Sequence, residues 1–110
     1  MTTADQIRAL ADTGTPLPWL ALVGNSWGGR SAAGTTDGYP VGFTGDDPNS
    51  GPDAVKIVAA VNALPHIADL IDAFDNVPLD GDPSPEPWEQ WWRNLFAARD
   101  ALVEALGVTA

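Results

Sequence analysis

The sequence predicts a single α+β domain: a short first helix, a small antiparallel sheet, a kinked central helix and an amphipathic, Trp-rich C-terminal helix. Two patterns favour this class, namely helical spacing of apolar residues near both ends and a glycine- and threonine-rich stretch with a hairpin turn between them. The third observation is length, because 110 residues with 45% hydrophobic content suit one compact core. We expect residues 1–76 to form a helix–sheet–helix core, 77–87 a proline-rich linker and 88–106 the last helix.

The first helix is predicted from the capping-box spacing of Thr3 and Gln6, with apolar residues following on one face. Thr13-Gly14 ends this pattern. Two prolines then favour extended backbone that leads into Trp19–Val23, an apolar run typical of a buried strand. We interpret this run as the first strand.

A hairpin is predicted in the polar stretch that follows. Asp37-Gly38, a dipeptide favoured in tight turns, separates Arg30–Thr35 from Tyr39–Thr44. Two or three short antiparallel strands satisfy this composition.

The central helix is predicted to run from Pro52-Asp53 to Phe74, after a loop at residues 46–52. Pro65 lies inside it, where proline removes a backbone donor and clashes with the preceding turn. We therefore expect the helix to kink or divide near Leu64.

The last helix has the clearest pattern, from about Pro87 to Leu106, with Ser84 or Glu86 near its cap and Gly107 as its stop. Aromatic residues are enriched at binding hot spots, and a large uncovered apolar patch is an aggregation liability. The apolar side chains of this last helix either cap the sheet of the same chain or form the interface of a homo-oligomer, and both can hold at once. The broad apolar face carries Trp88, Trp91, Trp92, Leu95, Phe96, Leu102, Val103 and Leu106, of which Trp88, Trp91, Trp92, Leu95 and Phe96 are the predicted interface.

Charge and composition narrow the function. Fifteen acidic and five basic residues give a formal net charge of −10, which repels a polyanion, so direct nucleic-acid binding is not expected. The start of the chain lacks the pattern of a signal peptide, and no window approaches the ~20 apolar residues of a membrane span. The chain has no cysteine, which excludes disulfides and thiolate metal sites. We expect a soluble, acidic, cytoplasmic protein without a cofactor.

Residues suited to catalysis or metal binding are few. His66 is the only histidine, and with Asp69 or Asp72 it forms the only plausible acid–base pair. Because no nucleophile accompanies it, we do not expect an enzyme. The acidic loop at residues 46–53 lacks the glycine and the final glutamate of an EF-hand, so no metal site is expected.

The glycine-rich stretch Gly24–Arg30 matches neither the dinucleotide fingerprint nor the Walker pattern, and a wide hairpin turn is the simpler interpretation. Exposed backbone donors beside Arg30, with Trp27 as a stacking plane, nevertheless suit a small anionic or aromatic ligand. Such a site would need more basic groups, and Arg93 and Arg99 of the last helix are the candidates.

Two stretches, Ile7–Ala11 leading to Thr15–Trp19 and Asp53-Ala54 leading to Ile57–Pro65, resemble small accessory proteins of actinobacterial bacteriophages, of the Ead-like early-protein type. Members have a short helix, a Thr-Pro-Gly-Pro-Trp stretch before a small sheet, and a long helix with an Ala-Ala-x-Asn-Ala-x-Pro break. Here Leu17 replaces the usual glycine, and the Trp-rich segment replaces a charged tail. The resemblance implies a phage-encoded, cytoplasmic accessory protein and supplies no catalytic residues.

The leading hypothesis is therefore a phage accessory protein that interferes with host biology by non-catalytic binding. In one form it is an anti-defence protein that sequesters a nucleotide-type signal near Trp27, Arg30 and an arginine of the last helix. In the other it docks as an acidic decoy on a basic host protein. The alternatives are a virion-assembly component, with the Trp face buried in a larger particle, and an unidentified enzyme that uses His66.

Overall fold

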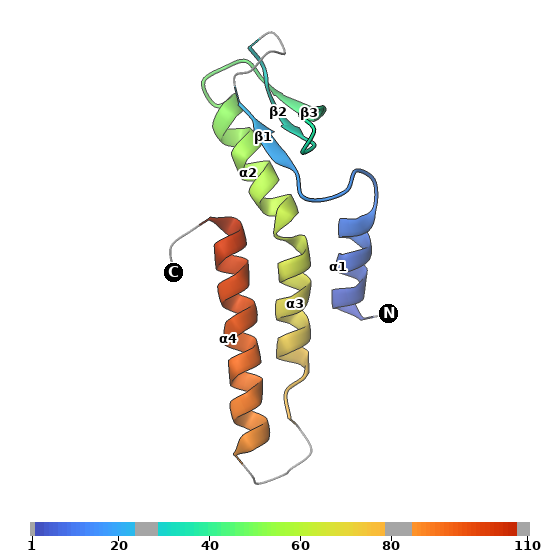
Figure 1. Ribbon diagram of the computed structural model, residues 1–110, viewed down its shortest axis with the longest axis vertical. Helices are drawn as coiled ribbons and strands as arrows, with labels where there is room; N and C mark the ends of the chain where they lie inside the picture. The colour runs from blue at the N-terminus through green and yellow to red at the C-terminus, as the bar shows by residue number, and fades with distance from the viewer. Residues whose placement is uncertain (1, 24–28, 79–84, 108–110) are drawn as a thin grey trace. The chain divides into compact units, whose positions relative to one another are not determined.

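The computed structural model describes residues 2–23, 29–78 and 85–107. In these ranges the chain forms four helices and a small sheet, which confirms the predicted α+β layout (Figure 1). The elements are α1 (Thr3–Asp12), β1 (Leu20–Leu22), β2 (Ser31–Gly34), β3 (Pro40–Gly45), α2 (Ser50–Asn62), α3 (Leu64–Asp75) and α4 (Glu86–Leu106).

Contacts divide the chain into two compact units. The helical unit comprises the described residues of 1–9 and 63–110, and the sheet unit comprises those of 10–62. This division falls within α1 and at the break between α2 and α3. By its contacts α3 therefore groups with α4, on which it packs, rather than with the sheet. The predicted single domain, with parts 1–76, 77–87 and 88–106, stays a prediction.

The sheet unit holds a three-stranded antiparallel sheet in the order β1-β2-β3, with α2 packed against all three strands. The predicted turn joins β2 to β3: the Gly38 N–H donates to the Thr35 carbonyl at 3.0 Å, and Gly38 has a φ of 87°. Glycine adopts this left-handed region without steric cost, so the hairpin prediction is confirmed. The first strand is shorter than the predicted Trp19–Val23.

Small residues allow the elements of the sheet unit to approach closely. Every residue of β2 is buried. A Cβ atom at Gly34 would lie 2.7 Å from the Tyr39 carbonyl oxygen and would also meet the Leu22 side chain. At Gly51 it would lie 2.8 Å from Cγ1 of Val23. The interior of this unit therefore depends on backbone proximity more than on large side chains.

Asn62 ties the end of α2 to the start of β1. Its Oδ1 accepts the Trp19 N–H at 2.8 Å, and its Nδ2 donates to the Trp19 carbonyl at 2.9 Å. The side chain thus satisfies both backbone groups of Trp19, which explains a polar residue on an otherwise apolar helix face.

The break predicted near Leu64 is confirmed. Ala63 separates α2 from α3, and Pro65 lies in the first turn of α3, where a missing N–H breaks no helical hydrogen bond. The start of α2 was predicted too late. Asp47 accepts hydrogen bonds from the Asn49 N–H at 2.8 Å and from the Ser50 hydroxyl at 3.1 Å. The Asn49 carbonyl accepts the first helical hydrogen bond, from the Asp53 N–H at 2.9 Å, so the helix begins at Ser50.

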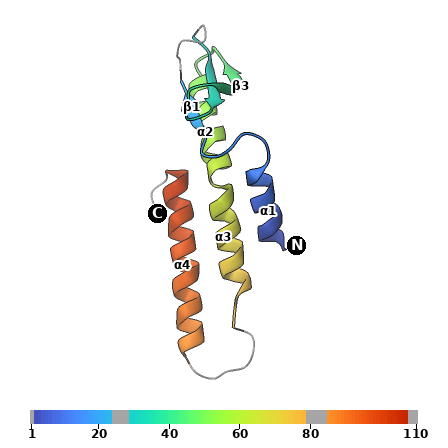
Figure 2. The same cartoon turned by 45° about the vertical axis from the view of Figure 1, so that its right-hand side comes forward.

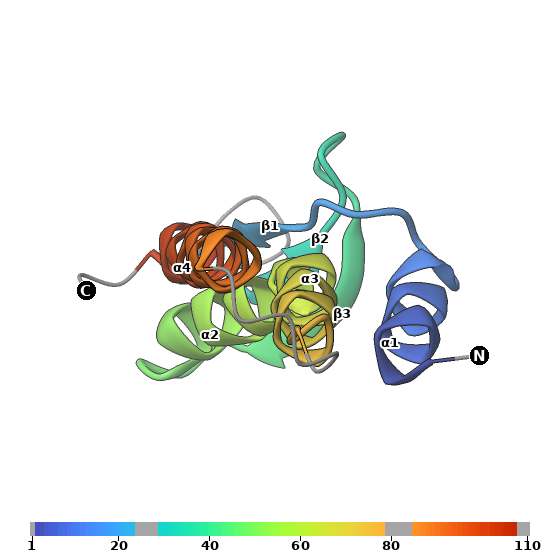
Figure 3. The ribbon, with the colours of Figure 1, turned by 90° about the horizontal axis from the view of Figure 1, so that it is seen from below.

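In the helical unit, α3 lies between the start of α1 and α4 (Figures 1, 2 and 3). The capping box of α1 lies one residue earlier than predicted: the Asp5 N–H donates to Oγ1 of Thr2 at 3.1 Å, and the Thr2 N–H donates to Oδ2 of Asp5 at 3.3 Å. Asp5 is short enough to reach back to Thr2, and it takes the place predicted for Gln6.

Helix α4 spans 21 residues and ends, as predicted, at Gly107, which has a φ of 71°. Pro85 occupies the N-cap position without a side-chain cap, and Glu86 is the first helical residue. The alternative cap Ser84 and most of the predicted linker lie outside the described residues.

In the described part of the chain no single helix is long and apolar enough to cross a membrane, although α2 and α3 together, as a bent pair, reach the required length and composition.

Candidate functional site

The broad apolar face of α4 divides into two stripes that differ in burial. The inner stripe is half-buried; Trp91 contacts a ring of α3, and Leu95 and Ala105 line clefts with α3. The outer stripe is exposed, with 41% of Trp88 and 48% each of Trp92 and Phe96 accessible. The inner stripe comprises Trp91, Leu95, Ala98, Leu102 and Ala105. The outer stripe comprises Trp88, Trp92, Phe96 and Leu106, and the half-buried Val103 lies on the same side of the helix as the outer stripe.

The rings of the two stripes form one aromatic cluster. The Trp91 ring centroid lies 5.9 Å from Trp88, 4.9 Å from Trp92 and 6.2 Å from Phe74 of α3. Trp92 in turn stacks on Phe96, with 5.5 Å between centroids and 22° between planes. Each such pair contributes about 0.5–1.5 kcal/mol beyond the area it buries. The exposed rings are therefore held in place by their neighbours before any partner arrives.

Trp91 is the centre of this cluster, and its indole N–H is buried without an acceptor among the described residues. A buried donor left unsatisfied costs about 1–3 kcal/mol. The ring of Trp91, rather than its polar group, therefore accounts for a tryptophan at this position.

Arg93 and Arg99, two predicted ligand-binding residues, each have a carboxylate partner within α4. Nη2 of Arg93 lies 3.7 Å from Oε2 of Glu89, and Nη2 of Arg99 lies 3.0 Å from Oδ1 of Asp100. The Arg99 guanidinium also lies 5.4 Å from the Phe96 ring centroid. Six positions apart, the two arginines point about 120° from each other around the helix. Arg99 therefore borders the outer stripe, whereas Arg93 lies on the polar face.

The other two predicted ligand-binding residues lie elsewhere. Trp27 is outside the described residues. Arg30 belongs to the sheet unit, where its guanidinium lies 5.5 Å from the Phe43 ring centroid. A ligand site formed by Trp27, Arg30, Arg93 and Arg99 stays a prediction.

His66 lines a cleft of about 400 Å³ between α3 and α4, together with Ala101, Glu104 and Ala105. Its expected acid partners, Asp69 and Asp72, instead bind Arg8. Within the described ranges, no group of three or more His, Cys, Asp or Glu residues is placed to hold a metal ion.

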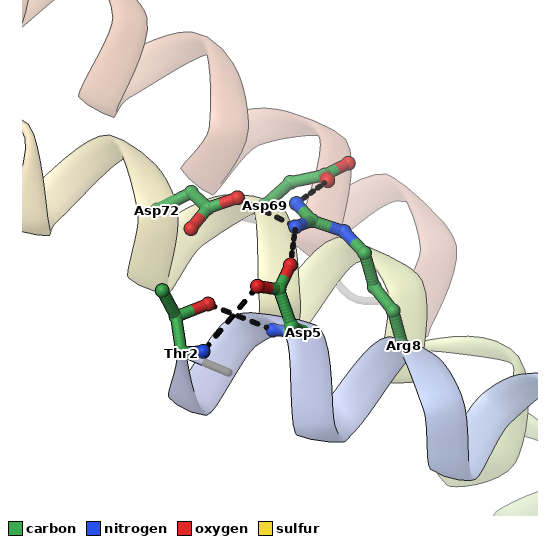
Figure 4. Close-up of polar contacts among 5 residues, drawn as sticks. All are labelled: Thr2, Asp5, Arg8, Asp69 and Asp72. Atoms are coloured by element: carbon green, nitrogen blue, oxygen red, sulfur yellow. Dashed lines mark hydrogen bonds and ion pairs between the residues drawn. The ribbon is translucent and has the colours of Figure 1, made fainter.

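Arg8 links the start of α1 to α3 (Figure 4). Its Nη2 lies 2.8 Å from Oδ1 of Asp69, and its Nη1 lies 2.6 Å from Oδ2 of Asp72 and 3.7 Å from Oδ1 of Asp5. The hydrogen bonds to Asp69 and Asp72 raise the pKa of Arg8 above its usual value, so the guanidinium stays charged. This contact was missed at the sequence level, where the i,i+3 spacing of the two aspartates was its only signal.

A groove between α3 and α4 adjoins the aromatic cluster and was also missed. It has a volume of about 410 Å³, and we call it the seam groove. Leu95 lies about 40° from Trp91 and about 60° from Trp92 around the helix, and so at the edge of the inner stripe that is nearer the outer stripe. The lining residues are Leu70, Ile71, Phe74 and Asp75 of α3 and Leu95 of α4.

Comparison of the chain with protein-family models, with curated proteins and with solved structures finds no match. The resemblance to Ead-like phage proteins therefore stays a prediction that rests on its short motifs.

Proposed function

We propose that this chain is a non-catalytic binding protein that recognises another protein through the outer stripe of α4. The observation that carries this is the exposure of Trp88, Trp92 and Phe96, by 41–48%, while ring contacts hold them on one helix. Tryptophan is enriched at protein–protein hot spots, and an apolar helix face is a recurrent recognition element. Because these rings are already ordered, this chain loses less side-chain entropy when a partner binds them.

Charge favours a protein over a nucleotide-type ligand. Arg8, Arg93 and Arg99 are the cationic side chains of the helical unit, and each is already paired with a carboxylate of that unit. The cation at the outer stripe is Arg99, which already pairs with Asp100, so a phosphate there would compete with that carboxylate. The proposal therefore follows the protein-docking form of the leading hypothesis rather than the nucleotide-sequestering one.

The phage origin and the anti-defence role are proposed on the resemblance of residues 7–19 and 53–65 alone. A homo-oligomer formed through the outer stripe, and burial of this stripe in a larger particle, stay predictions of the same surface.

Site-specific photo-crosslinking tests the proposal. A photoreactive residue at position 92 is expected to crosslink to a partner protein, whereas one at position 90, about 160° away around α4, is not. Trp92→Ala and Phe96→Ala should lower crosslinking from position 88 at least about fivefold, and the exposed control Asn94→Ala should leave it unchanged. Equal crosslinking from positions 90 and 92 would refute the proposal. Crosslinked pairs of this chain, checked by light scattering, would identify the partner as a second copy.

A further inference from the structure

We infer that the outer stripe and the seam groove form one docking surface for a basic amphipathic segment of a partner protein. An apolar side chain of that segment occupies the groove, and a lysine or arginine beside it pairs with Asp75. This inference rests on the proposed function and specifies the chemistry of the partner.

The seam groove accepts an apolar group because its walls are apolar. Leu70, Ile71 and Phe74 come from α3, and Leu95 comes from α4. Its volume of about 410 Å³ falls within the range of ~300–1,000 Å³ typical of binding pockets. Phe74 is 61% exposed, so this wall gains further burial when a partner side chain enters.

Ring contacts join the groove to the outer stripe. Phe74 lies 6.2 Å from Trp91, and Trp91 lies 5.9 Å from Trp88 and 4.9 Å from Trp92, measured between ring centroids. One apolar surface therefore continues from α3 across the seam to the exposed side of α4. A surface of this extent on two neighbouring helices fits an elongated amphipathic segment better than a single small molecule.

The charge of this surface selects the partner. Asp75 is the charged residue that lines the groove, and it has no cationic partner among the described residues. Glu86 and Glu104 of α4 likewise have no ion pair within the described ranges. Because every arginine of the helical unit already binds a carboxylate, the charge left without a counter-charge is negative. A partner that supplies lysine or arginine neutralises it.

The same charges argue against the other occupants of this surface. A second copy brings another formal charge of −10, and its helical unit offers no arginine that lacks a carboxylate partner. Nucleic acids and anionic lipid surfaces are repelled for the same reason. A basic protein segment is the occupant whose apolar and charged groups both match.

Two synthetic peptides test this inference. Both are amphipathic helices without tryptophan that share one leucine face, and they differ only in lysines replaced by glutamates. Binding is measured by the fluorescence anisotropy of the labelled peptide at low and high salt. The basic peptide should bind at least about tenfold more tightly than the acidic one, and its affinity should fall as salt is added. Equal affinity of the two peptides would overturn the inference.

Matched variants then test whether a lysine of the basic peptide pairs with Asp75. Asp75→Asn should weaken binding of the basic peptide about two- to fivefold, and Asp75→Lys should weaken it further. Asp46→Asn makes the same charge change at an exposed position of the sheet unit and should change binding less than twofold. Equal effects of the two substitutions would show that net charge acts without the groove, and the inference would be wrong.

The outcome for the groove is separable from that for the proposed function. If Trp92→Ala abolishes crosslinking to a partner but the basic peptide does not bind, the inference fails and the proposed function stands. If Trp92→Ala leaves partner crosslinking unchanged, the proposed function itself fails.

Discussion

Both units of this protein bury small side chains, among them Ala4, Ala63 and Ala68 in the helical unit, but they differ in what joins their elements. In the sheet unit the buried residues are small, such as Ala32, Ala33 and Ala54, and glycines bring the backbones together. In the helical unit the large aromatic side chains of α4 hold the contact with α3, yet no residue of α4 is fully buried. Large apolar side chains are exposed in both units, such as Tyr39 and Val55 in the sheet unit, but on α4 the exposed rings of Trp88, Trp92 and Phe96 belong to one cluster.

This difference separates folding from binding within a single helix. Trp91 and Trp92 are neighbours in sequence, but Trp91 is half-buried and contacts the Phe74 ring, whereas Trp92 is 48% exposed. We expect residues of the inner stripe to determine stability and those of the outer stripe to determine partner affinity.

The largest expected effect is that of Trp91→Ala. Loss of a ring that contacts three others should lower the free energy of unfolding by about 2–3 kcal/mol, less than the 3–5 kcal/mol of a fully buried aromatic residue. Trp92→Ala, the matched control, removes two ring contacts of an exposed side chain and should cost less, about 1–2 kcal/mol. Urea denaturation followed by circular dichroism gives both values. Similar losses for the two variants would remove the distinction between the stripes.

The next effect tests the close packing of the sheet unit. Gly34→Ala should destabilise the protein by about 1–3 kcal/mol, because the new Cβ would lie 2.7 Å from the Tyr39 carbonyl oxygen and the backbone must shift. Gly42→Ala is the matched control in the neighbouring strand, where a Cβ meets nothing within 4 Å. Thermal denaturation should show a lower Tm for Gly34→Ala alone, because alanine at Gly42 meets nothing and restricts only the unfolded chain. An equal fall in both variants would show that the contact with Tyr39 is not the cause.

Features of the fold that depend on one or two neighbouring residues were predictable from the sequence. The turn at Asp37-Gly38, the helix break before Pro65 and the helix end at Gly107 follow from the backbone angles that glycine and proline allow or forbid. The capping of α1 was misplaced because the sequence offers two pairs at the same spacing, Thr2 with Asp5 and Thr3 with Gln6, and the structure uses the first.

The candidate site was predictable only in part, because the division of the apolar face of α4 into an inner and an outer stripe depends on a second helix, α3. The spacing of apolar residues identified the aromatic face of α4, but Trp91 and Trp92 fit that face equally well until α3 covers one of them. The seam groove needs residues more than 20 positions apart, Leu70 and Leu95, and no local pattern connects them. Arg8 and Asp69 are likewise 61 positions apart.

A smaller effect is expected from the unsatisfied indole N–H of Trp91. Trp91→Phe keeps an aromatic ring against Phe74 and Trp88 but removes the indole N–H that has no acceptor among the described residues. The smaller ring lowers the free energy of unfolding, whereas removal of the unsatisfied N–H raises it. The free energy of unfolding should therefore stay within about 1 kcal/mol of the parent value. A loss as large as that of Trp91→Ala, measured by the same urea denaturation, would mean that the N–H has an acceptor in solution.

The smallest expected effect concerns the polar side of the helical unit. Arg8→Gln leaves Asp5, Asp69 and Asp72 without their shared cation, so the amides of α1 should exchange with deuterium faster, and added salt should reduce the difference by screening the carboxylates. Arg8→Lys keeps the charge but not the forked geometry, so the exchange rate of its α1 amides should fall between those of the parent and of Arg8→Gln. Because the folded pKa of Arg8 is raised, its contribution is fully present below the unfolded pKa and is lost only as pH rises through the folded one. After correction for intrinsic exchange rates, the difference in amide exchange between the parent and Arg8→Gln should therefore be the same at mildly acidic and mildly alkaline pH. If the difference disappeared within this pH range, Arg8 would not hold α1 to α3 by its charge.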